Sequence, residues 1–234
     1  MSKLRFSNPV FVAIDTPDLD KALAIARSAG PHVGGLKVGL EFITAQGPDG
    51  IRKIVALGRP VFADVKFHDI PNTVAGAARE IAKVGASIFN IHASGGEAMM
   101  RAAKDAAGTI NPDMKVIAVT LLTSLDENDV AAVGYRGSAA DQVVRLASLA
   151  QKSGLDGVVC SAHEIAAIRK ACGDDFLLVV PGIRPAGADL ADQRRVMTPR
   201  EAADAGADIL VIGRPINAAA DPGEAARAIQ ESLK

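Results

Sequence analysis

Eight short apolar runs recur along this chain of 234 residues, and segments of helical length separate them. The runs are continuous rather than alternating, which is typical of strands that are covered on both faces. They are Val10–Ile14, Gly35–Val38, Val61–Val65, Ser87–His92, Lys115–Leu122, Gly157–Cys160, Phe176–Val180 and Ile209–Ile212. Ala-rich amphipathic stretches lie between them, for example Leu19–Ala29, Val74–Lys83, Ala98–Ala107, Ala139–Lys152 and Glu164–Ala171. Eight strand–helix units without an obvious linker predict an α/β fold, a single (β/α)8 TIM barrel that forms one domain over residues 1–234.

An open, doubly wound parallel sheet is the alternative architecture. Sheets of that kind that bind dinucleotides carry a Gly-rich loop after the first strand. Here the first apolar run is followed by Thr16-Pro17-Asp18, which favours the closed barrel.

One junction nearly repeats, and it supports the same reading. Val84–Ile88, Ser153–Gly157 and Ala205–Ile209 each combine a helix end, a glycine, a short turn and the start of an apolar run. We interpret this repeat as the recurring helix-to-strand connection of (βα) units.

Charge and composition exclude several classes of partner. The formal net charge is −1, so no overall field attracts nucleic acid. No run of about 18 apolar residues exists that could span a membrane. The two cysteines, Cys160 and Cys172, are not in a CxxC spacing and are expected to be buried apolar residues. We therefore expect a cytoplasmic protein that binds neither nucleic acid nor membrane.

The third apolar run leads into a dense group of charges, Asp64, Lys66 and Asp69. Because a strand alternates its faces, Phe62, Asp64 and Lys66 should point one way and Ala63, Val65 and Phe67 the other. Charges beside a packed core are costly unless they pair or take part in chemistry. A purely structural salt bridge at the strand end remains the alternative.

Polar residues and glycines also follow most of the other predicted strands. In a barrel of this kind the carboxyl ends of the strands form the functional rim. A ring of stabilising ion pairs would not need the Thr, Ser and Gly positions, so a functional site is favoured. The residues at this rim are Asp15, Lys37, Gly39, Asp64, Lys66, Asp69, His92, Thr123, Ser124, Pro181, Arg184, Gly213 and Arg214. Of these, His92 is expected to be a hydrogen-bonded packing residue and not part of the site.

The last two strand ends resemble a phosphate-binding site. Gly213-Arg214-Pro215 offers a backbone N–H near a helix start together with a fork-shaped cation. The segment Pro185–Thr198 is long for such a loop and carries Gln193, Arg194 and Arg195, which favours a lid over the phosphate. An ordinary solvated surface loop is the alternative.

The pattern Asp-x-Lys-x-x-Asp-Ile-Pro-Asn-Thr at Asp64–Thr73 resembles the hallmark of the orotidine 5′-phosphate decarboxylase family. The resemblance extends along the whole chain. It includes Asp15, Lys37-Val38-Gly39, Leu122-Thr123-Ser124, Pro181-Gly182-Ile183-Arg184, Asp192-Gln193 and Val211-Ile212-Gly213-Arg214-Pro215.

This resemblance implies decarboxylation of orotidine 5′-monophosphate to UMP and CO2, without a metal or organic cofactor. Lys66 would give a proton to C6 within an array formed with Lys37, Asp64 and Asp69. The resemblance also implies a homodimer in which Asp69, Ile70 and Thr73 reach the neighbouring subunit's site. The substrate contacts implied are Asp15 and Lys37 to the ribose, Thr123 to the pyrimidine, and Gln193, Gly213 and Arg214 to the phosphate, with Arg184 and Pro181 nearby.

Two other functions remain open at this point. Related barrels that act on sugar phosphates share the Asp-x-Lys-x-x-Asp core and use magnesium, so a magnesium-dependent decarboxylase or aldolase is one alternative. A nucleotide-binding barrel without catalytic activity is the other.

Overall fold

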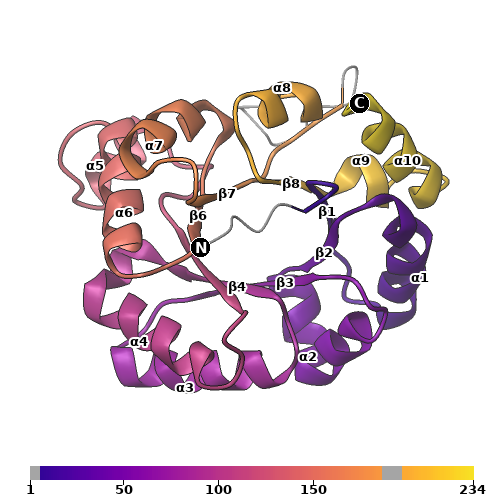
Figure 1. Ribbon diagram of the computed structural model, residues 1–234, viewed down its shortest axis with the longest axis horizontal. Helices are drawn as coiled ribbons and strands as arrows, with labels where there is room; N and C mark the ends of the chain where they lie inside the picture. The colour runs from indigo at the N-terminus through magenta and orange to yellow at the C-terminus, as the bar shows by residue number, and fades with distance from the viewer. Residues whose placement is uncertain (1–5, 186–196) are drawn as a thin grey trace.

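The chain folds into a closed barrel of eight parallel strands surrounded by helices (Figure 1). The computed structural model describes residues 6–185 and 197–234. Neighbouring strands follow chain order, and β8 closes the barrel by pairing with β1. The predicted TIM barrel is therefore confirmed, and the open sheet is excluded.

The strands lie close to the predicted apolar runs. They are β1 (Val10–Ile14), β2 (Gly35–Val38), β3 (Val61–Phe67), β4 (Ile88–His92), β5 (Lys115–Val119), β6 (Gly157–Val159), β7 (Leu177–Val180) and β8 (Ile209–Ile212). The main difference is β5, which was predicted to continue to Leu122. Its ladder partner β6 already ends at Val159, and Thr120 directs both its N–H and its hydroxyl to the Val159 carbonyl.

Helices connect each strand to the next and form the outer layer. They are α1 (Leu19–Ala29), α2 (Leu40–Val55), α3 (Pro71–Lys83), α4 (Gly96–Gly108), α5 (Glu127–Ala132), α6 (Ala139–Lys152), α7 (Ile165–Cys172), α8 (Pro199–Asp204), α9 (Arg214–Asn217) and α10 (Pro222–Ser232). Five of them, α1, α5, α6, α8 and α10, begin with a capping side chain. In α6, for example, Ser138 and Asp141 form a reciprocal capping box.

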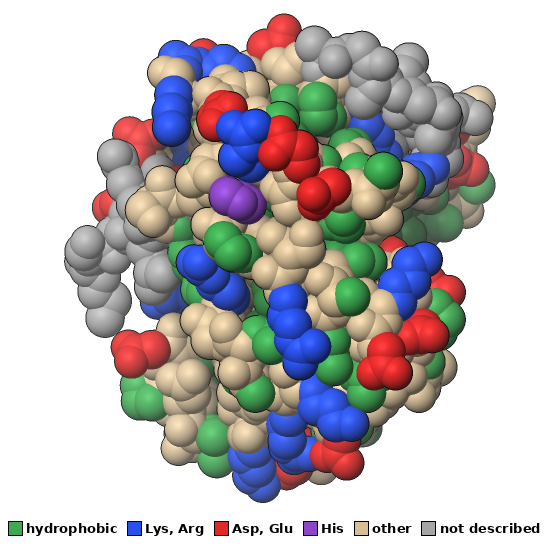
Figure 2. Space-filling model, turned by 90° about the vertical axis from the view of Figure 1, so that its right-hand side faces the viewer, with side chains coloured by type: hydrophobic (Ala, Val, Ile, Leu, Met, Phe, Trp, Pro, Cys, Tyr) green, Lys and Arg blue, Asp and Glu red, His purple; other side chains and the backbone are tan. Residues whose placement is uncertain are grey.

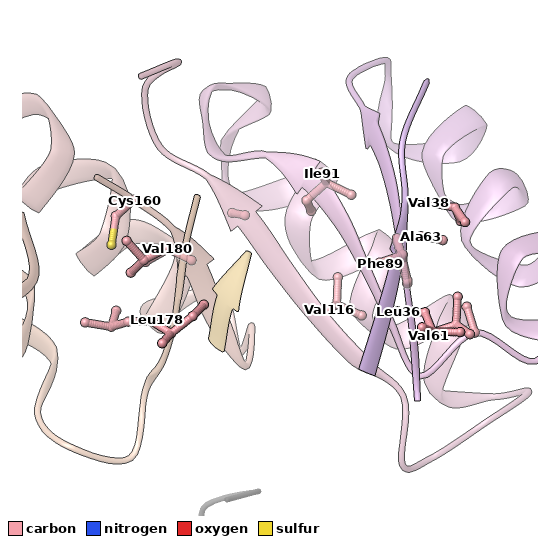
Figure 3. Close-up of a cluster of buried hydrophobic side chains, with 14 of the residues drawn as sticks. Leu36, Val38, Val61, Ala63, Phe89, Ile91, Val116, Cys160, Leu178 and Val180 are labelled. Carbon is pink, nitrogen blue, oxygen red and sulfur yellow. The ribbon is translucent and has the colours of Figure 1, made fainter. Parts of the chain in front are cut away.

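Two apolar layers hold the barrel together. The inner layer fills the barrel and is centred on Phe11, Phe62, Ile88 and Ile117. The outer layer lies between strands and helices, and Figure 3 shows part of it. The strands supply both layers by alternation, since Phe62 faces inward while its neighbours Val61 and Ala63 face the helices.

The repeated junction has a structural role that the sequence pattern did not reveal. The last residue before β4, β6 and β8 is Ser87, Asp156 and Asp208, respectively. Each side chain accepts a hydrogen bond from a backbone N–H at or near the start of the preceding strand: Val61, Val116 and Leu178, respectively. The junction therefore links neighbouring strands at the amino end of the barrel, opposite the predicted functional rim.

The distribution of charge on the surface and the burial of the cysteines agree with what the sequence predicted. Figure 2 shows acidic and basic side chains interspersed over the side of the molecule that carries α1. Cys160 and Cys172 are both buried and free. Within residues 6–185 and 197–234, no helix is both long and apolar enough to cross a membrane.

Candidate active site

A cavity of about 350 Å³ opens at the carboxyl ends of the strands. Its lining combines the inner apolar residues of the barrel with charged side chains from several strand ends. Nine of the residues singled out from the sequence line it: Asp15, Lys37, Asp64, Lys66, Thr123, Pro181, Arg184, Gly213 and Arg214. The rim positions thus converge on one site, as their places at the strand ends predicted.

Asp64 lies at the centre of the charges in this cavity. Its Oδ1 accepts a hydrogen bond from Lys66 Nζ at 2.5 Å, and its Oδ2 pairs with Lys37 Nζ at 2.7 Å. Only 7% of Asp64 is exposed, so this carboxylate is held between two ammonium groups away from bulk water. Phe62, Asp64 and Lys66 all line the cavity, which confirms the predicted face of β3.

The two lysines keep Asp64 ionised. Burial alone would raise the pKa of this carboxyl, but the ammonium groups of Lys37 and Lys66 outweigh it and lower the pKa to about 2. Because both carboxylate oxygens are paired with lysines, Asp64 is poorly placed to serve as a ligand for a metal ion. In the described part of the chain, no three His, Cys, Asp or Glu side chains are grouped so as to hold one.

Lys66 has an unusual backbone conformation. Its φ is +50°, and it is the only residue other than glycine with a positive φ in the described part of the chain. The β3–β4 register shifts at this point, between Ala63 and Phe67. A non-glycine residue in the left-handed region is strained, and such residues cluster at functional sites.

Asn90 is a site residue that the sequence reasoning missed. It lies in β4, lines the cavity and is 1% exposed. Its Oδ1 accepts from the Lys66 backbone N–H at 2.8 Å, and its Nδ2 donates to Asp64 Oδ1 at 2.7 Å. The available signal was a carboxamide in the middle of an otherwise apolar strand, where a buried polar group needs partners.

Asp15 lies beside the lysine array because two glycines leave room for it. A Cβ on Gly39 would come within 3.3 Å of both Asp15 Oδ1 and Lys37 Nζ. A Cβ on Gly213 would lie 3.5 Å from Asp15 Oδ2. The ends of β1, β2 and β8 thus approach one another around this carboxylate.

Two arginines contribute positive charge at the ends of β7 and β8. Arg184 is 7% exposed, and its Nη1 donates to the Ile183 carbonyl at 3.0 Å. Arg214 is more exposed and begins α9 directly after Gly213. Both side chains line the cavity, so its lining is suited to an anionic ligand.

Of the remaining predicted residues, those that the structure describes do not line the cavity of this chain. Asp69, Ile70 and Thr73 lie at the exposed junction of β3 and α3, and Ile70 is 67% exposed. Asp69 Oδ1 accepts from the Ile70 N–H at 2.7 Å. Gln193, Arg194 and Arg195, with most of the segment 185–198, lie outside the described residues.

Comparisons with known proteins give one consistent result. The family model described as "Orotidine 5'-phosphate decarboxylase / HUMPS family" matches residues 8–229. A protein named orotidine 5′-phosphate decarboxylase from Novosphingobium aromaticivorans is 55% identical, over 97% of this chain and 100% of that protein. One of the same name from Paramagnetospirillum magneticum is 54% identical, over 97% and 98%, respectively.

A solved structure agrees with these relatives. The crystal structure of orotidine 5′-phosphate decarboxylase from Lactobacillus acidophilus superposes with a TM-score of 0.86 and 40% identity. The match covers 97% of this chain and 100% of that chain. On the family match and these identities, the chain belongs to the orotidine 5′-phosphate decarboxylase / HUMPS family.

Proposed function

We propose that this chain decarboxylates orotidine 5′-monophosphate to UMP and CO2, the last step of de novo pyrimidine nucleotide synthesis. Family membership and the names of the close relatives support this activity. The observation that carries it is the pairing of one buried carboxylate, Asp64, with both Lys37 and Lys66 inside the rim cavity.

The chemistry explains why such an array is useful. Cleavage of the C6–carboxylate bond releases CO2 and leaves the electron pair on C6, where the ring carbonyls cannot delocalise it directly. A cation that is already positioned stabilises that developing charge without reorganisation. Lys66 Nζ then gives its proton to C6, which forms the C6–H bond of UMP, and the lysine is reprotonated from solvent.

Asp64 acts on the lysines and on the substrate. As an ionised carboxylate it favours the protonated ammonium form of Lys66 and fixes its direction. Its charge also lies beside the position of the departing carboxylate in this proposal, so decarboxylation relieves a repulsion between like charges.

The other cavity residues bind the parts of the substrate that do not react. Asp15 and Lys37 contact the ribose, Thr123 contacts the pyrimidine, and Gly213 and Arg214 hold the phosphate, with Arg184 and Pro181 nearby. The convergence of these side chains on one cavity supports the assignment. Gln193 is assigned to the phosphate by the family resemblance alone.

We further infer a homodimer in which Asp69, Ile70 and Thr73 complete the partner's site. Their exposure on this chain and the accessible apolar side chain of Ile70 support this arrangement. Residues 1–234 act as one catalytic domain in this proposal, in the cytoplasm, and the reaction needs no cofactor. The pairing of both Asp64 oxygens with lysines favours a reaction without metal over the magnesium-dependent alternative.

The decisive experiment mixes the purified protein with orotidine 5′-monophosphate in the presence of EDTA. We expect the orotate absorbance to fall and UMP and CO2 to form in equal amounts. Activity that requires added magnesium and a sugar phosphate would indicate the alternative enzyme. Binding of UMP without any turnover of orotidine 5′-monophosphate would indicate a binding protein instead.

Lys66→Ala tests the proton donor. We expect turnover to be abolished, because the cation and the proton are both lost, while the barrel stays folded by circular dichroism. Appreciable turnover by the well-folded variant would remove Lys66 from this role.

A further inference from the structure

Asn90 lies where the pairing of β3 with β4 is irregular. Ala63 is opposite Phe89 and Phe67 is opposite Ile91, so residues 64–66 of β3 face Asn90 alone. Extra residues in one strand leave backbone groups without their usual ladder partners. The side chain of Asn90 supplies such a partner, since its Oδ1 accepts the Lys66 backbone N–H at 2.8 Å.

Both ends of this carboxamide are used, which determines its orientation. The Lys66 N–H can only donate, so it must meet the amide oxygen. The ionised carboxylate of Asp64 can only accept, so it must meet Nδ2, at 2.7 Å. Because Asn90 is 1% exposed, water does not readily replace either contact.

These contacts bear directly on Lys66. Its backbone is strained at φ +50°, and such a conformation persists only where the surroundings determine it. Its backbone N–H is bound by Asn90, and its Nζ is bound by Asp64 Oδ1, which Asn90 also contacts. One side chain thus holds the lysine backbone and the carboxylate that receives the lysine ammonium.

We propose that Asn90 is a positioning residue that keeps Lys66 in its left-handed conformation and orients Asp64, so that the ammonium is aimed into the cavity. Neither leucine nor aspartate can replace both contacts. Leucine has a similar size but no polar atoms, and aspartate would place a second carboxylate against Asp64. The catalytic part of this inference rests on the proposed decarboxylation, and the backbone part does not.

Kinetics test the catalytic part. In Asn90→Ala and Asn90→Leu, misplacement of Lys66 should lower kcat by about 100-fold. The inhibition constant of UMP should change by less than about threefold, because the remaining contacts to ribose and phosphate are intact. The matched control is Gln142→Leu, a buried amide on α6 that bonds the Arg136 carbonyl and should leave kcat unchanged.

A double-mutant cycle in thermal stability tests the backbone part without any assay of activity. Glycine adopts a positive φ without strain, so Lys66→Gly removes the need for Asn90 to hold this backbone. Asn90→Ala should therefore lower Tm in the Lys66→Gly background by no more than about half of its effect on the wild type. If Asn90→Ala alone does not fold, the double variant with Lys66→Gly should fold.

The outcomes separate this inference from the proposed function. Equal Tm losses in the two backgrounds, or a double variant that does not fold, would overturn the positioning role. A kcat loss below about threefold, or equal changes in kcat and UMP affinity, would also overturn it. A wild type without turnover would refute the proposed function and leave the stability cycle interpretable.

Discussion

At the scale of single residues, Asp64 is the carboxylate that pairs with both lysines of the cavity. One carboxylate faces two ammonium groups, so the triad of Asp64, Lys37 and Lys66 carries an excess of positive charge. Removing one member of a buried ion network costs more than the network contributes, because the remaining charges lose their partner. Substitution of one member of the triad should therefore lower the free energy of unfolding as well as the activity proposed for this site.

The pH dependence of stability should reveal the state of Asp64. Its pKa is lowered from 3.8 to about 2 by Lys37 and Lys66, so its contribution is present above pH 4 and lost as pH falls toward 2. The shift corresponds to about 2 kcal/mol in the free energy of unfolding. Urea unfolding of wild type and Asp64→Asn should give a stability difference that narrows over this pH range. Parallel pH profiles would show that Asp64 is not held ionised by the lysines.

Arg214 should affect turnover as well as binding. In the proposed function it holds the phosphate, and binding energy from such a remote group helps to assemble the reacting site. Arg214→Ala should raise KM and lower kcat, with kcat/KM reduced by about 10- to 100-fold, as expected for the loss of a hydrogen bond to a charged group. Arg214→Lys keeps the charge and should lose less. Unchanged steady-state kinetics in Arg214→Ala would remove the phosphate from this assignment.

The sequence predicted which side chains of β3 face the cavity. It could not predict the register of the strands or the backbone conformation of Lys66, because both depend on the folded sheet. Strand alternation placed Phe62, Asp64 and Lys66 on one face, which the structure confirms. Alternation does not report an irregular register, and a lysine carries no preference for φ +50°. Asn90 escaped notice because its partners come from another strand, and only the folded register brings them together.

At the scale of elements, hydrogen bonds from the repeated junctions join neighbouring strands at the amino end of the barrel. Asp208 Oδ2 accepts from the Leu178 N–H at 2.8 Å and from Arg169 Nη2 at 2.6 Å. Asp156 Oδ2 likewise accepts from the Val116 N–H and from Lys104 Nζ. In barrels of this class the amino end is associated with stability, whereas the carboxyl end carries the chemistry.

Arg169→Met should separate stability from activity. This arginine also donates to the backbone carbonyls of Gly173, Asp174, Phe176 and Gly206, so its loss leaves Asp208 and four carbonyls with fewer partners. We expect the free energy of unfolding to fall by about 3 kcal/mol, with kcat unchanged at temperatures where the variant is folded. The control is Arg227→Met on α10, whose ion pairs are exposed and should matter little. A loss of kcat in the folded Arg169→Met variant would contradict this division.

Element boundaries were predictable where a local signal marks them. The predicted limits of α1 and α6 are those of the structure, and their starts are marked by the N-caps Asp18 and Ser138. The end of β5 was predicted three residues too late, because the apolar character of the sequence continues through Leu122 while the ladder does not. Leu122 instead lies beyond the strand, where it lines the cavity and is 42% exposed.

At the scale of the whole molecule, the number and order of the apolar runs were sufficient to predict the closed barrel. Eight parallel strands leave no free edge once β8 pairs with β1. Dimer formation could not be predicted in this way, because neither periodicity nor composition distinguishes an exposed loop that contacts a partner subunit from an ordinary surface loop. The homodimer therefore stays a prediction, motivated by the family resemblance and by the exposure of Asp69, Ile70 and Thr73 on this chain.

Mixing two inactive variants tests whether Asp69 acts across the dimer. If each site combines Lys66 of one subunit with Asp69 of its partner, a mixed dimer of Lys66→Ala and Asp69→Ala has one site with both defects and one intact site. Random reassociation makes about half of the dimers mixed, so about a quarter of all sites should be active. Unmixed controls of each variant, denatured and refolded in the same way, should stay inactive. If Asp69 instead serves its own subunit, every site in the mixture carries one defect and no activity returns, because exchange of subunits then leaves each damaged site as it was.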